Sequence, residues 1–163
     1  MEQVEFTLPN NRNLELEGLG SIIQPKWSSL KAELTAGSSH YNLEPRGFWG
    51  TRFELLQNGR VMYEVKAGFW GKVTVTPLHE AHHFYTITYG KGFNKGYRLL
   101  DYKGEEVATV TSGMRKWKTF YTLSTIPGFT DTDQGKLLAL LLVRNYRGAQ
   151  QAAVAAGTTH IAG

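Results

Sequence analysis

Apolar and polar residues alternate in short segments from Glu2 to about Thr125. In residues 61–66 the larger apolar side chains recur at every second position, and residues 85–89 repeat this spacing with threonines in between. Alternation of this kind is typical of strands that bury one face of an antiparallel sheet. The pattern predicts roughly ten or more short strands before the chain changes character.

Two pairs of these segments are separated by residues that favour tight turns. Asn58-Gly59 lies between residues 52–56 and 61–66, and Asn-Gly is a preferred pair where a hairpin turn needs positive φ. Lys103-Gly104 takes the same position within residues 97–110, whose pattern is similar. Each of the two stretches is therefore predicted to form a β-hairpin.

The pattern changes after Pro127, where good helix formers replace the β-branched residues. A helix is predicted over about residues 133–147. Asp131 or Asp133 is its expected N-cap, and Gly148 is its expected stop.

Residues 137–143 are apolar on every side of this helix, so it has no face that suits water. The run is far shorter than the roughly 20 residues that a bilayer span requires. Arg144 and Arg147 follow it directly and would lie in the hydrocarbon of a membrane. We therefore expect protein to enclose the helix.

A length of 163 residues, of which 41% are hydrophobic, suits a single domain with one core. Many strands followed by one enclosed helix predict a mainly β fold, a closed antiparallel β-barrel wrapped around one hydrophobic C-terminal helix. Closure removes the exposed sheet edges, and the interior gives the helix an apolar environment. The barrel and its helix are expected within residues 1–148, and residues 149–163, rich in alanine and glycine, are expected to form a flexible tail.

Positive charge is concentrated in the second part of the chain. Residues 1–65 carry 6 Lys/Arg against 8 Asp/Glu, whereas residues 66–163 carry 12 against 6. In the basic part, cations alternate with aromatic residues, which suits anionic lipid headgroups or nucleic acid, while a solvated strand face is the simpler alternative. The candidate ligand-binding residues are Lys91, Lys95, Arg98, Arg115, Lys116 and Lys118.

One segment matches a catalytic motif, because His79, Glu80 and His83 satisfy the H-E-x-x-H pattern of zinc proteases. That chemistry needs both histidines on one long helix, yet the strand-like residues 84–89 follow at once. The segment is predicted to be a polar loop without a metal; if it held one, the ligands would be His79, His82 and His83. A zinc metallohydrolase is therefore a remote alternative.

Two glycine-flanked Phe-Trp pairs, in residues 47–50 and 68–71, loosely resemble the glycine–tryptophan signature of lipocalins. A lipocalin-like binder of small hydrophobic ligands is thus a second alternative. Lipocalins keep their barrel hollow and their amphipathic helix outside, which suits residues 137–143 poorly.

The chain contains no cysteine, which excludes disulfides, thiolate metal sites and cysteine nucleophiles. Glycine fingerprints for nucleotides and a nucleophile elbow are also absent from the sequence, so we expect a non-catalytic protein without a cofactor. Residues 1–9 contain two glutamates and no basic region before an apolar stretch, so they do not suggest a signal peptide. The expected location is the cytoplasm.

On these features the chain resembles the tubby C-terminal-domain superfamily, which includes the LURP-one-related proteins, the phospholipid scramblases and small bacterial relatives. The resemblance covers about residues 1–148 and rests on the hairpins in residues 53–65 and 97–110 and on the helix of residues 136–147. It implies a barrel of about twelve strands around the C-terminal helix.

The resemblance also implies a non-catalytic adaptor or sensor that contacts membranes peripherally. Tubby domains hold lipid phosphates with Lys and Arg side chains on strands, so the basic residues named above are expected to bind a phosphoinositide-like headgroup. The cysteine-rich, proline-rich and calcium-binding segments of scramblases are missing, so lipid transport is not expected. Nucleic-acid binding fits the same charge and stays an alternative.

Overall fold

The computed structural model describes residues 1–9, 13–25, 30–47, 50–68, 71–90 and 96–162, with side chains as far as residue 152. Its helices are the short 3-10 helices η2 (Leu78–Glu80) and η3 (Phe129–Asp131) and the α-helix α1 (Asp133–Ala162). Its strands are β1 (Glu2–Phe6), β2 (Leu14–Leu16), β3 (Gly20–Ile23), β4 (Ala32–Ala36), β5 (Ser39–Arg46), β6 (Arg52–Gln57), β7 (Arg60–Ala67), β8 (Val73–Pro77), β9 (Tyr85–Tyr89), β10 (Tyr97–Leu100), β11 (Glu106–Arg115) and β12 (Lys118–Thr125).

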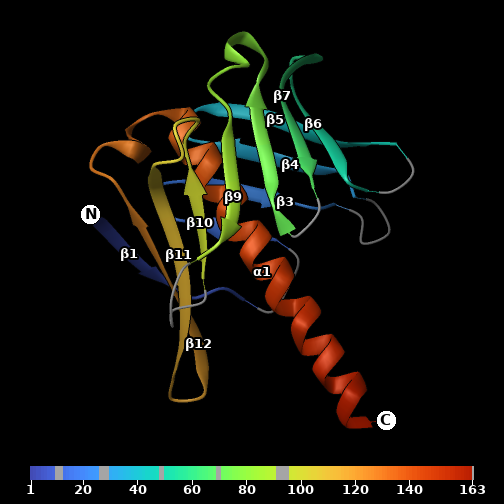
Figure 1. The fold of residues 1–163 in the computed structure, drawn as a ribbon, viewed down its shortest axis with the longest axis vertical. Helices are drawn as coiled ribbons and strands as arrows, with labels where there is room; N and C mark the ends of the chain where they lie inside the picture. Colours follow the sequence, from blue (N-terminus) through green and yellow to red (C-terminus); the bar gives the residue numbers. More distant parts are fainter. Residues whose placement is uncertain (10–12, 26–29, 48–49, 69–70, 91–95, 163) are drawn as a thin grey trace.

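These strands form one antiparallel sheet of twelve strands that curves around α1 (Figure 1). Neighbours in sequence are neighbours in the sheet from β2 to β12, and β1 completes the order by pairing with β12. β1 and β2 are the two edge strands and do not pair with each other, so the barrel is nearly rather than fully closed. The predicted fold class, a mainly β barrel around a single C-terminal helix, is confirmed, and so are both predicted hairpins.

The burial pattern explains why the sheet closes around this helix. Along β4 and β8 every second residue is buried, and the inward residues of β4, together with Val73 and Val75 of β8, belong to the same core cluster as the helix. Every residue from Leu137 to Val143 is at most 1% exposed, so this part of α1 is covered on all sides. The prediction of an enclosed helix is therefore correct.

The start of α1 differs from the expected aspartate cap. Thr132 is the cap, because its Oγ1 accepts a hydrogen bond of 3.0 Å from the backbone N–H of Gly135. Asp133 instead accepts hydrogen bonds from the hydroxyls of Ser39 at 2.6 Å and Ser38 at 2.9 Å, which lower the pKa of its carboxyl. The helix start is thereby joined to the turn between β4 and β5.

The end of α1 also lies elsewhere than expected. The helix does not stop at Gly148 but continues to Ala162. Gly148 does not adopt the positive φ of a helix-terminating glycine, and alanines and glutamines follow it. A single glycine costs a helix about 1 kcal/mol, which the good helix formers around it offset.

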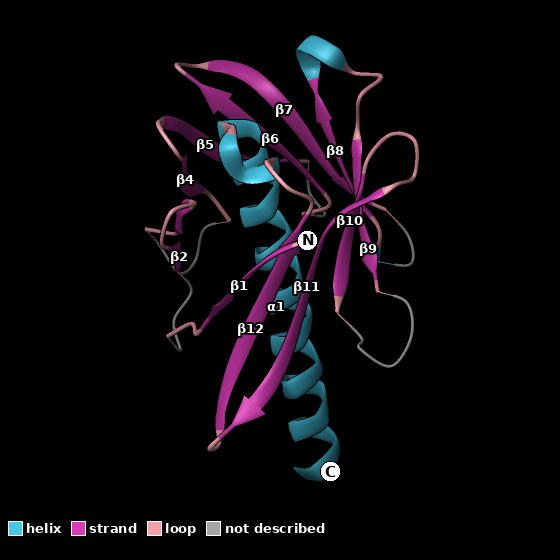
Figure 2. Cartoon of the chain, turned by 90° about the vertical axis from the view of Figure 1, so that its left-hand side faces the viewer, coloured by secondary structure: helices cyan, strands magenta, loops and turns pink. Residues whose placement is uncertain are grey.

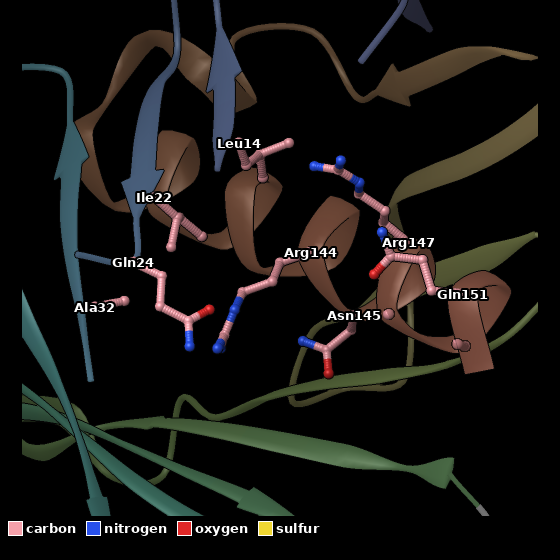
Figure 3. A pocket seen from close by; sticks show the side chains of 10 residues that line it. Leu14, Ile22, Gln24, Ala32, Arg144, Asn145, Arg147 and Gln151 are labelled. Atoms are coloured by element: carbon pink, nitrogen blue, oxygen red, sulfur yellow. The ribbon is translucent and has the colours of Figure 1, made fainter. Parts of the chain in front are cut away.

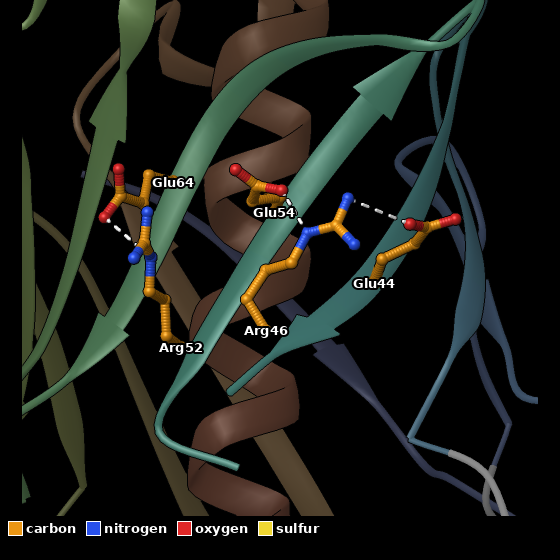
Figure 4. Close-up of polar contacts among 5 residues, drawn as sticks. All are labelled: Glu44, Arg46, Arg52, Glu54 and Glu64. Carbon is orange, nitrogen blue, oxygen red and sulfur yellow. Dashed lines mark hydrogen bonds and ion pairs between the residues drawn. The ribbon is translucent and has the colours of Figure 1, made fainter. Parts of the chain in front are cut away.

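On the outer face of β5, β6 and β7, acidic and basic side chains form two parallel rows (Figure 4). Register places Glu44, Glu54 and Glu64 side by side, an arrangement that is destabilising without counter-charges. Arg46 bonds both Glu44 and Glu54, and Arg52 bonds Glu64 at 3.2 Å. These arginines therefore supply the counter-charges for the row of glutamates.

The barrel interior is occupied by α1 rather than hollow, as Figure 1 shows. The Phe-Trp pairs at 48–49 and 69–70, which suggested a lipocalin, lie outside the described residues. None of the helices in the described ranges is both long and apolar enough to cross a lipid bilayer.

Candidate functional site

The four candidate basic residues that the structure describes do not form one patch. Lys91 and Lys95 lie outside the described residues. Arg98 lies on β10 opposite Thr109, and its Nε donates to the backbone carbonyl of Tyr89 at 3.1 Å. Thr109 precedes Arg115 by six residues on β11, so Arg98 lies roughly 20 Å from the end of that strand. The structure does bring together the other three, Arg115, Lys116 and Lys118, at the turn between β11 and β12.

The β11–β12 hairpin projects beyond its neighbours. β10 pairs with β11 only as far as Val110, and β1 pairs with β12 only from Tyr121 onward. Among the described residues, the last three cross-strand pairs, from Gly113↔Phe120 to Arg115↔Lys118, therefore have no third strand beside them. They extend the hairpin roughly 10 Å past its described neighbours. Figure 2 shows its end at one extreme of the long axis, the direction in which the C-terminus of α1 also points.

The turn at this end has an uncommon backbone. Arg115 pairs with Lys118, so the turn consists of Lys116 and Trp117, with φ of +52° and +69°. The β6–β7 hairpin has the same two-residue arrangement, but there Asn58-Gly59 supplies the positive φ angles. Residues other than glycine and asparagine rarely adopt a positive φ, and each one that does lowers the stability of the fold by about 1 kcal/mol. Lys116 and Trp117 therefore do not optimise the turn.

Exposed apolar and cationic side chains share this turn. Trp117 is 94% exposed and Met114 is 67% exposed, so neither gains packing energy from the barrel. Lys116 and Lys118 are exposed, and their side chains make no ion pair with any residue in the described ranges. We name residues 114–118 the β11–β12 tip.

Arg115 has a structural role within the tip. Its guanidinium donates to both carboxylate oxygens of Glu5 on β1, at 2.8 and 3.4 Å, and lies 4.3 Å from the ring centre of Phe120. The Phe120 ring in turn lies across Gly113, where a Cβ would meet it. The aromatic ring and the ion pair together brace the projecting hairpin against β1.

The base of the hairpin is anchored to the central helix. The Ser112 hydroxyl lies 2.7 Å from the Tyr146 hydroxyl, and the Gln150 amide donates to both, at 2.7 and 3.1 Å. Tyr146 also packs against the rings of Tyr97 and Tyr121. The tip is thus an exposed end on a base fixed by hydrogen bonds and aromatic contacts.

The histidine segment forms no comparable site. Its helical part is η2 alone, three residues long, rather than the long helix of a zinc protease. His83 Nδ1 lies 3.2 Å from Glu80, a contact that lowers the pKa of Glu80, while the His79 ring packs edge-on against Tyr63. In the described part of the chain, no three His, Asp or Glu side chains converge in a way that could hold a metal.

Known proteins do not identify the function of this site. Comparisons with models of protein families, with curated proteins and with solved structures gave no match to the chain. The resemblance to the tubby superfamily, which rests on the two hairpins and the terminal helix, stays a prediction.

Proposed function

We propose that this chain is a non-catalytic module that binds anionic membrane surfaces peripherally through the β11–β12 tip. The observation that carries the proposal is Trp117, which is 94% exposed between two lysines, in a turn that its own side chain disfavours. Unfavourable backbone at an exposed position is common where a residue is kept for binding rather than stability.

The chemistry of the tip suits the boundary between lipid headgroups and acyl chains. Tryptophan concentrates at this boundary because its ring is apolar and its N–H is polar. Met114 adds a flexible apolar side chain beside it. Each lysine near an anionic surface contributes about 1 kcal/mol of attraction, so Lys116 and Lys118 give the tip its preference for anionic lipids.

The shape of the molecule places the tip ahead of the barrel body. In both views the tip and the C-terminal end of α1 lie toward the same end of the long axis, and η2 and the turn between β6 and β7 lie toward the opposite end (Figures 1 and 2). The hairpin can therefore reach a flat surface before the body of the barrel does. A preference for phosphoinositides over other anionic lipids, which the tubby resemblance implies, is the finer part of the proposal, as is a cytoplasmic location facing an anionic leaflet.

The double variant Lys116→Asn, Trp117→Gly gives the tip the same turn residues as the β6–β7 hairpin. We expect its free energy of unfolding to be unchanged or higher by about 1 kcal/mol, because Asn-Gly suits two positive φ angles. Co-sedimentation with mixed phosphatidylcholine–phosphatidylserine vesicles should instead fall at least about tenfold, because one cation and the interfacial ring are gone.

Lys103→Asn is the matched control, because it removes one positive charge from the exposed turn between β10 and β11 and leaves the tip intact. Its vesicle binding should stay close to that of the wild type. Binding of the wild type should fall at physiological salt relative to low salt and should be weak on pure phosphatidylcholine. Undiminished binding by the double variant would contradict the proposal. Repeating the assay with phosphoinositide-containing vesicles of the same net charge measures the preference for one headgroup over another.

A further inference from the structure

A second candidate site lies where α1 leaves the barrel, independent of the tip. A cavity of about 410 Å³ opens there between the helix and strands β2 to β4 (Figure 3). Leu14, Ile22 and Ala32 line its strand side, and Arg144, Asn145 and Gln151 are among the α1 residues that line it. The space exists partly because the adjoining helix positions, Gly148 and Ala149, carry almost no side chain.

Arg144 is the unusual member of this lining. It is partly buried, and burial lowers the pKa of its guanidinium. It makes no ion pair or hydrogen bond with a residue in the described part of the chain. Its guanidinium instead lies over the Phe53 ring in a cation–π contact, 5.9 Å from the ring centre. Arg46, Arg52 and Arg115 on the outer surface, by contrast, all pair with glutamates. A partly buried guanidinium without an anion carries a desolvation cost, which favours an external partner.

Arg147, one turn further along, provides an internal comparison. It is 8% exposed, and its two terminal nitrogens donate to the carbonyl oxygens of Asn13 at 3.0 Å and Pro9 at 2.7 Å. Arg147 thereby ties the segment between β1 and β2 to the helix. Figure 3 shows the two side chains pointing apart, Arg147 toward Leu14 and Arg144 toward Gln24. Of these two arginines, Arg144 is the one that points into the cavity and does not tie another described segment to the helix.

We infer that this cavity binds a small organic molecule through a single carboxylate or phosphate group held by Arg144. The planar guanidinium donates two parallel hydrogen bonds to an oxyanion, the partner that its geometry fits best. The volume is within the usual range for small-molecule sites and leaves room for an uncharged body against Leu14 and Ile22. Asn145 and Gln151 place amides around that body.

Titration calorimetry on the full chain with benzoate and with its neutral isostere benzamide tests this inference. Benzoate is expected to bind with a dissociation constant in the millimolar range, as suits so small a probe, and benzamide at least about tenfold more weakly. Phenyl phosphate tests the phosphate form of the same group. Equal binding of benzoate and benzamide, or binding of neither benzoate nor phenyl phosphate at tens of millimolar, would overturn the inference.

Arg144→Met should weaken the binding of both anions at least about tenfold, while Arg60→Met, which removes an exposed cation on β7, should not. Arg144→Met should melt at the wild-type temperature or higher, because it removes a partly buried charge, whereas Arg147→Met should melt lower, because the Pro9 and Asn13 carbonyls lose their donor. If Arg144→Met does not fold, Arg144 is structural and the inference fails; Arg144→Gln then serves to check that result.

The source of the oxyanion follows from vesicle binding by Arg144→Met. If the variant loses anion binding but still sediments with phosphatidylserine vesicles, the ligand is a soluble molecule. If it loses both, the oxyanion belongs to a lipid headgroup, because α1 leaves the barrel toward the same end as the tip (Figure 2). Both results support an oxyanion site in the cavity. Unchanged anion binding by Arg144→Met would overturn the inference, whether or not the tip binds vesicles.

Discussion

Leu140→Asp is expected to unfold the barrel. Leu140 is fully buried at the middle of the enclosed part of α1 and belongs to the apolar core cluster. Aspartate would leave a cavity and would bury a carboxylate in this apolar core, so the loss should be about 5 kcal/mol or more. Because domains of this size are stable by only about 5–15 kcal/mol, most of the folded population should disappear.

Leu78→Asp is the matched control for this substitution. Leu78 lies in η2 and is 45% exposed, so the same change of side chain there should alter the free energy of unfolding by less than about 1 kcal/mol. Urea unfolding followed by circular dichroism measures both variants. A wild-type midpoint for Leu140→Asp would contradict an enclosed helix.

Gly135→Ala is expected to destabilise the fold by about 3 kcal/mol or more, although alanine normally favours helices. A Cβ at residue 135 would overlap the backbone carbonyl oxygen of Phe129 and would crowd the Thr132 hydroxyl that caps the helix. The obstacle is backbone in η3, which cannot move aside as a flexible side chain could. Glycine is therefore needed here for close approach rather than for flexibility.

Gly148→Ala should have the opposite sign in the same helix. No atom lies within 4 Å of a Cβ at residue 148, so alanine adds helix propensity without a clash. The expected gain is about 1 kcal/mol. Thermal unfolding of both variants should give one midpoint below and one above that of the wild type, and a shift of both in the same direction would contradict the packing of η3 on α1.

Local patterns were sufficient to predict a sheet of ten or more strands, the two hairpins and the enclosed helix. The alternation along the strands and the apolar run over residues 137–143 each report directly which faces must leave water. The pairing of β1 with β12 is different, because it joins the two ends of the barrel sequence and depends on the closure of the whole sheet. Strand register over such a separation has no local signal.

The tip illustrates a partial prediction. The sequence marks Arg115, Lys116 and Lys118 as basic residues beside aromatic ones, but Lys116-Trp117 has no turn residue, so nothing local places a hairpin turn there. Positive charge interleaved with aromatic residues groups Arg98 with them, but strand register separates it from the tip. The structure adds the exposure of Trp117 and Met114, which neither charge nor motif predicts.

The arginines at the end of the apolar run show a similar limit. Arg144 and Arg147 both lie near the C-terminal end of the predicted helix of residues 133–147, where positive charge is favoured, so helix polarity does not distinguish them. Their roles diverge because they point in different directions, one to the Pro9 and Asn13 carbonyls and the other into a cavity. That difference depends on the strands around the helix.

The proposed function is tested most directly by measuring whether the tip itself enters a membrane. The chain has no cysteine, so Met114→Cys creates a single labelling site in the tip and Ala81→Cys creates one beside η2, near the opposite end of the long axis. Each variant is labelled with an environment-sensitive fluorophore and mixed with phosphatidylserine-containing vesicles. A blue-shifted, brighter emission is expected for the label at residue 114, with no change at residue 81, and this shift should disappear when phosphatidylcholine replaces the anionic lipid. Unchanged emission at residue 114 while the protein sediments with the vesicles would contradict the proposed function, because binding would then occur through another surface.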